Sequence, residues 1–323
     1  MSRIFAMLLP KFAPTSLTAA LCIVPLLTAC ATDDAESDDA AASDTAGSSG
    51  STGPSAETST TSPQGSDDAA STTEDADGTT SDGSNDTTVD GTSSGACVEP
   101  GGDPVQDAIT LTTADGKSIS GIVTRPSTGS CLPAALLLHQ FSNTKSQWDA
   151  HLATFIERGY VTLAIDLRGH GESDPQDGAF NDLLTDPDQA PLDVQAALEH
   201  LQGHQAVDTS RIAVVGTSIG ANLAVVAASQ DLGVRATVAI STRLTPVQSL
   251  LGGAQIAVGP LLCYAGETDG GGDQAMTCGA LEPLSSGPAD SVILPGSSAH
   301  GVTIVDTFPE TIPSILDFLD ANL

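Results

Sequence analysis

The sequence predicts an α/β fold in which a mostly parallel central sheet carries an antiparallel hairpin at its N-terminal end and helices on both faces. Six short, strongly apolar segments alternate with helical segments after residue 130, a pattern typical of parallel strands that are buried on both faces. Two alternating segments flank Asp115-Gly116 before them, which indicates a hairpin. Reactive side chains follow several apolar segments, at the carboxyl ends where open parallel sheets hold their ligands.

The elements can be placed in order along the chain. The hairpin strands are expected at residues 108–113 and 118–125, where apolar and polar side chains alternate. The segments that predict the core strands cover residues 134–139, 160–165, 211–216, 236–241, 260–266 and 291–295. Periodic or Ala-rich stretches predict helices near 146–158, 190–202, 219–229 and 312–321, and a weaker one at 245–252. Trp148, the single tryptophan, lies on the first of these helices and is expected to pack in the core.

The segment 211–222 identifies a candidate nucleophile. A β-branched apolar run leads into Gly216-Thr217-Ser218-Ile219-Gly220, and an Ala-rich helical stretch follows it. Small residues at positions 216 and 220 allow a sharp strand-to-helix turn that projects the Ser218 hydroxyl from the sheet. The alternative is a glycine-tolerant turn without chemistry, but the strand before and the helix after favour a nucleophile.

A serine nucleophile needs a base, and the base needs an acid that orients it. His300 is the only histidine after Ser218 and follows the strand predicted at 291–295. Asp269 follows the strand predicted at 260–266, with Glu267 and Asp273 as competitors for the role of the acid. The chain therefore presents serine, acid and histidine in the order that a strand–turn–helix nucleophile predicts.

From about residue 105 onward the chain resembles the α/β-hydrolase superfamily, most closely its compact dienelactone-hydrolase-like and esterase-like members. Residues 166–173 resemble the family signature D-x-R-G-x-G-x-S, in which His170 is expected to be structural. His139-Gln140-Phe141 stands where the family often has His-Gly-x, so Gln140 replaces the frequent glycine. The resemblance implies an oxyanion hole made by the backbone amides of Phe141 and Ile219.

The resemblance also sets limits on the substrate and on the pocket. A true dienelactone hydrolase uses cysteine where this chain has Ser218, so that substrate is not carried over. Lid-bearing members insert a large helical lid between the strands predicted here at 236–241 and 260–266, and these lie about 20 residues apart. Residues 180–189 can form only a small flap. We therefore expect no large lid and an open, shallow pocket.

Residues 1–30 are expected to be a signal peptide outside the fold. Arg3 and Lys11 form its positive region, an apolar run follows, and Leu27-Thr28-Ala29-Cys30 ends it in small residues. This ending resembles a bacterial lipobox, which implies that Cys30 is lipidated; ordinary cleavage near Ala29 is the alternative. Ala31 stands where an inner-membrane retention signal would have Asp, so we expect a lipid-anchored protein of the cell envelope, at the outer membrane, facing either the periplasm or the outside.

Residues 31–96 are expected to be a disordered tether between the anchor and a single domain at 97–323. Up to residue 95 the segment consists mainly of Ser, Thr, Asp, Gly and Ala, with 15 acidic and no basic or aromatic residues. Such a composition cannot bury enough apolar surface to fold. The whole chain carries 10 basic and 41 acidic side chains, a net charge of −31. An acidic surface of this kind repels phosphates, so we expect no nucleic-acid partner.

Four cysteines remain besides Cys22 of the leader and Cys30: Cys97, Cys131, Cys263 and Cys278. An exported protein meets an oxidising compartment, so the even number predicts two disulfides. The sequence-local pairing is Cys97–Cys131 and Cys263–Cys278, and other pairings remain open. No Cys or His spacing suggests zinc, and the aspartates around the three glycines at 270–272 give only a weak calcium pattern, so no metal or cofactor is expected.

Together these features predict a serine hydrolase that cleaves a small-molecule carboxylic ester and is held at a lipid bilayer by its N-terminal anchor. Alkoxide leaving groups need less acid assistance than amines, which favours esters over amides. A peptidase or amidase of the same fold is the near alternative. A non-catalytic, lipid-anchored binding module is a second alternative, of a different class. The oligomeric state is left open.

Overall fold

The computed structural model describes residues 96–323. The predicted leader with Cys30, and residues 31–95 of the predicted tether, lie outside the described residues. Within the described part of the chain, no helix combines the length and the hydropathy needed to span a membrane.

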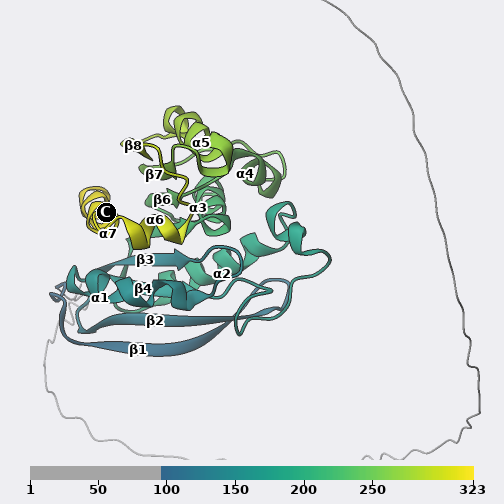
Figure 1. Cartoon of the computed structure of the whole chain (residues 1–323). Helices are drawn as coiled ribbons and strands as arrows, with labels where there is room; N and C mark the ends of the chain where they lie inside the picture. The colour runs from purple at the N-terminus through teal and green to yellow at the C-terminus, as the bar shows by residue number, and fades with distance from the viewer. Residues whose placement is uncertain (1–95) are drawn as a thin grey trace, which may run out of the picture. The chain divides into compact units, whose positions relative to one another are not determined.

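One sheet of eight strands organises residues 96–323 (Figure 1). The strands are β1 (Gly101–Thr112), β2 (Ser118–Thr128), β3 (Leu132–Leu138), β4 (Val161–Ile165), β5 (Val207–Thr217), β6 (Ala236–Ile240), β7 (Leu261–Gly266) and β8 (Ala289–Leu294). Their order across the sheet is β1-β2-β4-β3-β5-β6-β7-β8. Strand β2 runs antiparallel to β1 and β4, whereas the pairs from β4 to β8 are parallel. The predicted fold class is confirmed.

Helices cover both faces of the sheet. They are α1 (Asp149–Glu157), α2 (Ala190–Gly203), α3 (Ile219–Ser229), α4 (Leu244–Leu250), α5 (Asp273–Leu281), α6 (Val302–Thr307) and α7 (Thr311–Asn322). Successive residues of β3 enter two different cores: Ala134, Leu136 and Leu138 belong to one, and Ala135 and Leu137 to the other. The first core includes side chains of α2, α3, α4 and α5, and the second includes side chains of α1, α6 and α7. This alternation is the two-residue period of a strand that is buried on both sides.

The structure differs from the predicted elements at the sheet edge and near the C-terminus. Strand β1 begins at Gly101 rather than 108, because its first half is mostly exposed and its polar residues hide the strand pattern. Pro104 can lie there because an edge strand leaves one side of its backbone unpaired. Helix α6 was missed because Val, Thr and Ile dominate it and disfavour helices. Helix α5 was missed because it follows three glycines and contains Gly279.

The segment between β6 and β7 contains only the short helix α4 and turns, so the described chain has no large lid there. Helix α4 spans Leu244–Leu250, close to the weak helix predicted at 245–252. The flap predicted at 180–189 contains a short 3-10 helix, Phe180–Leu184. Trp148 is fully buried and packs in the core, as predicted.

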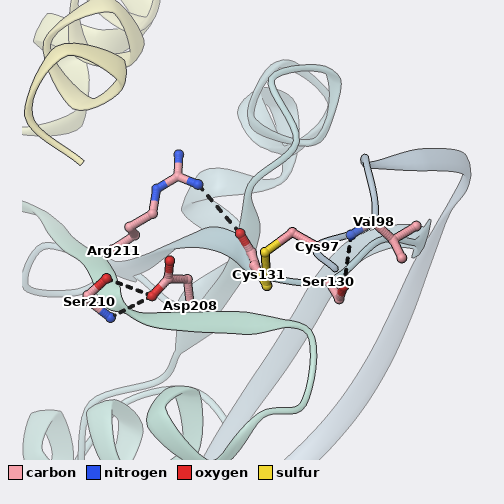
Figure 2. Close-up of a disulfide and its surroundings, with 7 residues drawn as sticks. All are labelled: Cys97, Val98, Ser130, Cys131, Asp208, Ser210 and Arg211. Carbon is pink, nitrogen blue, oxygen red and sulfur yellow. Dashed lines mark hydrogen bonds between the residues drawn. A yellow bond between two sulfur atoms is a disulfide. The ribbon is translucent and has the colours of Figure 1, made fainter. Parts of the chain in front are cut away.

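Two disulfides have the sequence-local pairing. Cys97–Cys131 joins the start of the domain to the turn before β3, with a Cα–Cα distance of 5.4 Å. Figure 2 shows this bond with the Val98 amide donating to Ser130 Oγ at 3.0 Å beside it. Cys263–Cys278 joins β7 to α5, with a Cα–Cα distance of 5.5 Å. The second bond encloses the loop that contains Asp269.

Removal of the Cys263–Cys278 bond should destabilise the domain. The double variant Cys263→Ala/Cys278→Ala opens a loop with a sequence separation of 15 residues, and the chain-entropy model gives a loss of about 3 kcal/mol for a loop of this size. A domain of this length should then melt roughly 6–12 °C lower. Urea and thermal unfolding under oxidising conditions measure the loss. An unchanged free energy of unfolding would show that the bond contributes nothing to the fold.

Candidate active site

Ser218 lies in a strained turn between β5 and α3. Its φ and ψ angles are 53° and −112°, a conformation that costs a residue with a side chain about 1–3 kcal/mol. A Cβ on Gly216 would overlap the Gly220 carbonyl, and a Cβ on Gly220 would lie 2.6 Å from the Leu138 carbonyl oxygen. The sequence therefore needs both glycines to bring α3 this close to β5 and β3. The turn leaves the Ser218 side chain at the carboxyl edge of the sheet.

Ser218, His300 and Asp269 form a continuous hydrogen-bonded row. His300 Nε2 lies 2.8 Å from Ser218 Oγ, and His300 Nδ1 lies 2.8 Å and 3.1 Å from the two carboxylate oxygens of Asp269. A carboxylate accepts from Nδ1–H, so Nε2 is left to accept a hydrogen bond from the Ser218 hydroxyl. The Asp269 side chain is almost fully buried (4% exposed), whereas that of His300 is 40% exposed. The row therefore runs from a buried carboxylate to a half-buried serine.

The two competitors for the acid position have other partners. Glu267 accepts a hydrogen bond from the Gly296 amide at 2.6 Å. Asp273 faces Arg243, with 3.5 Å between Asp273 Oδ2 and Arg243 Nη2. Of the three carboxylates, the structure brings only Asp269 to His300.

The loops that carry the acid and the base are tied together by their backbones. Thr268 donates from its amide (2.9 Å) and from its hydroxyl (3.1 Å) to the Ser297 carbonyl. On the other side, the Gly301 amide donates to the hydroxyl of Ser241, a buried residue just after β6, at 2.9 Å. His300 lies between these two attachments, so its main chain is held from both directions.

Phe141 and Ile219, whose amides are predicted as oxyanion donors, belong to two different elements. Ile219 begins α3, and Phe141 lies in the loop after β3. The close approach of Gly220 to the carbonyls of Leu138 and His139 sets the first turn of α3 against the end of β3. Among the hydrogen bonds of residues 96–323, neither amide donates to a protein acceptor.

His139 fixes the path of this loop. Its Nδ1 donates to the Gln140 carbonyl at 2.7 Å, so its Nε2 is the acceptor of the Leu167 amide at 3.0 Å. Burial lowers the pKa of His139 to about 4, which keeps the ring neutral at neutral pH. The imidazole therefore joins the ends of β3 and β4 as a donor on one side and an acceptor on the other.

The signature segment 166–173 is folded around two buried charges. Burial alone would raise the pKa of Asp166, but hydrogen bonds from the Lys145 ammonium and from the amides of Glu172 and Lys145 hold it below its ordinary value. Arg168 is fully buried and donates to Asp193 and Asp115. These pairs anchor the segment beside the loop of Phe141.

Three aromatic rings pack against one another at the loop of Phe141. The rings of Phe141 and Phe180 have centroids 4.6 Å apart, and His170 lies 5.6 Å from Phe141 and 5.4 Å from Phe180. His170 is buried and donates from Nδ1 to the Arg168 carbonyl. Phe180, in the flap, is 45% exposed. The flap thus contacts the loop of Phe141 through Phe180 and does not form a separate layer.

A cavity of about 280 Å³ opens between the turn after β6 and helix α5. Its lining includes Arg243, Asp273 and the exposed Met276. Ser218, Asp269 and His300 are not among the residues that line it. Within residues 96–323, no group of three or more His, Cys, Asp and Glu side chains is arranged to hold a metal ion.

Sequence patterns did not identify Gln147, Thr217 and Ser241, the polar residues that hold these loops. Gln147 accepts a hydrogen bond from the Gln140 amide at 3.1 Å and donates one to the Thr217 hydroxyl at 2.8 Å. Ser241 follows a strongly apolar strand directly, which is the signal by which the aspartate and the histidine were found. Gln147 lies on the predicted helix 146–158 and carries no such signal. Gln140 was identified only as a departure from a glycine, although its side chain accepts a hydrogen bond from the Val302 amide at 2.8 Å.

Comparison with known proteins gives one family match. The model of the alpha/beta hydrolase family matches residues 135–309, which is more than half of the chain. Among curated proteins, an uncharacterized 31.7 kDa protein of the traX–finO intergenic region of Escherichia coli is 30% identical over 107 residues. The match covers 33% of this chain and 36% of the relative, so the chain spans about a third of the length of that protein.

Solved structures share the fold. An esterase of Pyrococcus furiosus superimposes with a TM-score of 0.53 at 20% identity, over 68% of this chain and 91% of the esterase. An acetyl xylan esterase from Paenibacillus sp. R4 gives a TM-score of 0.57 at 22% identity, over 68% and 84% of the two chains. A predicted hydrolase from Thermoplasma acidophilum gives 0.53 at 22% identity, over 67% and 99%. At these identities the likeness is one of architecture.

His139 should make the stability of the domain fall as the pH is lowered. The folded protein keeps this ring neutral, with a pKa of about 4, while the unfolded chain takes up the proton near 6.5. Free energy of unfolding is therefore lost as the pH falls through this window, by about 2 kcal/mol at pH 5. Urea unfolding of the wild type and of His139→Gln at about pH 7.5 and about pH 5 measures the difference.

His151→Gln is the matched control, because its ring has a single side-chain hydrogen bond, to Asp306 at 3.3 Å. The control should lose as much stability on acidification as the wild type, and His139→Gln about 2 kcal/mol less. Equal losses in the wild type and His139→Gln would contradict the role given to His139.

Proposed function

Because the chain belongs to the alpha/beta hydrolase family, we propose that it is a serine hydrolase that cleaves small carboxylic esters by acyl transfer. The observation that carries the proposal is the row of hydrogen bonds from Ser218 through His300 to Asp269. A hydroxyl, an imidazole and a carboxylate in this order are the three groups that nucleophilic acyl transfer uses.

The reaction follows from the direction of these bonds. Ser218 Oγ attacks the carbonyl carbon of the ester while its proton passes to His300 Nε2. The carbonyl oxygen becomes an oxyanion, which the amides of Phe141 and Ile219 stabilise. Collapse of this intermediate breaks the bond to the alkoxy group, which leaves as an alcohol with the proton from His300. Water then attacks the acyl-serine and loses a proton to Nε2. The second tetrahedral intermediate breaks its bond to Ser218 Oγ, which takes this proton back, and the carboxylic acid leaves. Asp269 keeps Nδ1 protonated and stabilises the imidazolium.

Three observations favour an ester as the substrate. Structures with this architecture include proteins described as an esterase and as an acetyl xylan esterase. The described chain has no large lid between β6 and β7. The alcohol of an ester also leaves with less acid assistance than the amine of an amide.

Substitution of the three residues tests the proposal. Ser218→Ala and His300→Ala should lower kcat for p-nitrophenyl acetate by about 10⁴-fold or more. Asp269→Asn should lower it by about 10⁴-fold, because an amide favours the wrong imidazole tautomer. A fluorophosphonate probe should label wild-type Ser218 and leave Ser218→Ala unlabelled. Melting temperatures should stay close to that of the wild type.

Glu267→Gln is the control for the acid, since its amide oxygen can still accept the Gly296 hydrogen bond. It should keep wild-type activity. Full activity in Ser218→Ala would refute the serine hydrolase, and an unlabelled, inactive wild type would favour a binding module. A higher kcat/KM for an anilide than for the matching ester would favour an amidase or peptidase.

We propose further that Cys30 carries a lipid anchor. The support is the sequence alone: a positive and then apolar leader that ends in Leu27-Thr28-Ala29-Cys30. Lipid chains partition into a bilayer at about 0.8 kcal/mol per buried methylene, so more than one chain gives firm attachment.

Cys30→Ala should move the full-length protein from the membrane fraction of the expressing bacterium to other fractions. Mass spectrometry of the wild-type N-terminal peptide should show acyl chains on Cys30. Cys22→Ala, a second cysteine of the leader, is the matched control and should stay in the membrane fraction. An unacylated Cys30, or equal release of both variants, would contradict the anchor.

A further inference from the structure

The side chain of Gln140 bridges two loops of the candidate site. Its Oε1 accepts the Val302 amide at 2.8 Å, two residues after His300. Its own main chain is in the loop of Phe141 and is fixed by the Gln147 side chain, whose Oε1 accepts the Gln140 amide at 3.1 Å. One glutamine therefore links the loop that carries the oxyanion donor to the loop that carries the base.

Gln147 extends this link to the nucleophile. While its Oε1 accepts from Gln140, its Nε2 donates to the Thr217 hydroxyl at 2.8 Å. Thr217 directly precedes Ser218. The three bonds form one chain from the residue before the nucleophile, through Gln147 and Gln140, to the residue two places after the base.

The backbone near His300 is shaped around the Gln140 side chain. Gly301 has a φ of 55°, and a Cβ there would overlap Gln140 Oε1. Only a glycine fits both the positive φ and this contact. The Gln140 amide group thus occupies the space beside Gly301, and the loop of His300 is closed against it.

The exposure of His300 explains why this link matters. The Asp269 side chain is almost fully buried, whereas the His300 side chain is 40% exposed. Besides the hydrogen bonds of its ring to Asp269 and Ser218, the position of His300 depends on three attachments of its loop: Ser297 to Thr268, Gly301 to Ser241, and Val302 to Gln140. Of these three attachments, only the bond between Val302 and Gln140 connects the loop of His300 to the loop of Phe141.

We propose that Gln140 is a positioning residue that sets the distance between the base His300 and the oxyanion donor Phe141. Gln147 fixes Gln140 relative to the nucleophile Ser218, because it bonds both Gln140 and Thr217. This inference rests on the proposed function. A glycine at this position would leave the two loops without such a bond. A shift of about 1 Å in a catalytic group can cost about 10²-fold in rate, which sets the scale of the effect.

The test compares Gln140→Met with Gln140→Glu. Methionine has a similar volume but no acceptor for the Val302 amide, whereas the glutamate carboxylate keeps an acceptor. The kcat and KM for p-nitrophenyl acetate are measured on the plateau of each pH profile, together with the rate of fluorophosphonate labelling of Ser218. Assays are run well below the lowest melting temperature. Gln195→Met is the matched control, because Gln195 makes only a surface bond to Glu199 on α2.

Gln140→Met should lower kcat and the labelling rate together by about 10–100-fold, with KM within about twofold of the wild type. Gln140→Glu should recover most of this loss, and Gln195→Met should match the wild type. A wild-type kcat in Gln140→Met would overturn the inference, as would a Gln140→Glu variant as slow as Gln140→Met. If Ser218→Ala is inactive while Gln140→Met is normal, only this inference fails; if the wild type is inactive, the proposed function fails.

Discussion

The hydrogen bond between Ser218 Oγ and His300 Nε2 is the contact on which the rest of the site depends. It joins residues 82 positions apart and spans only 2.8 Å. The serine reaches it through a strained turn that two glycines make possible, and the histidine reaches it through a loop without tight packing around its ring. The strained turn of Ser218 and the partly exposed ring of His300 both need free energy to stay in place, so the surrounding structure must supply the stability.

That stability comes from polar attachments between the loops at the carboxyl edge of the sheet. His139 joins the ends of β3 and β4, Ser241 holds the residue after His300, and Thr268 holds the loop before it. The Cys263–Cys278 bond closes the segment that contains Asp269. These attachments exist before a substrate binds, so forming them costs little entropy at that step. Donors that are held in place in this way stabilise a developing oxyanion.

The sequence predicted the parts of this protein that depend on local pattern. The buried strands have continuous apolar runs, and Ser218, Asp269 and His300 each follow such a run in the order typical of the fold. Glu267 and Asp273 could not be separated from Asp269 in the same way, because all three follow β7 within a few residues and only their contacts in space differ. The exposed half of β1 and the helices α5 and α6 escaped prediction, since packing rather than propensity determines them. Gln140 was visible as an unusual residue, but its bond to Val302 connects positions 162 residues apart.

The role of Ser218 is tested most directly by a crystal structure of the protein after reaction with a small fluorophosphonate. Continuous density should join phosphorus to Ser218 Oγ, with His300 still bonded to Asp269. The phosphoryl oxygen should lie within about 3 Å of the amide nitrogens of Phe141 and Ile219. An adduct on another residue, or a phosphoryl oxygen turned away from both amides, would contradict the proposed site.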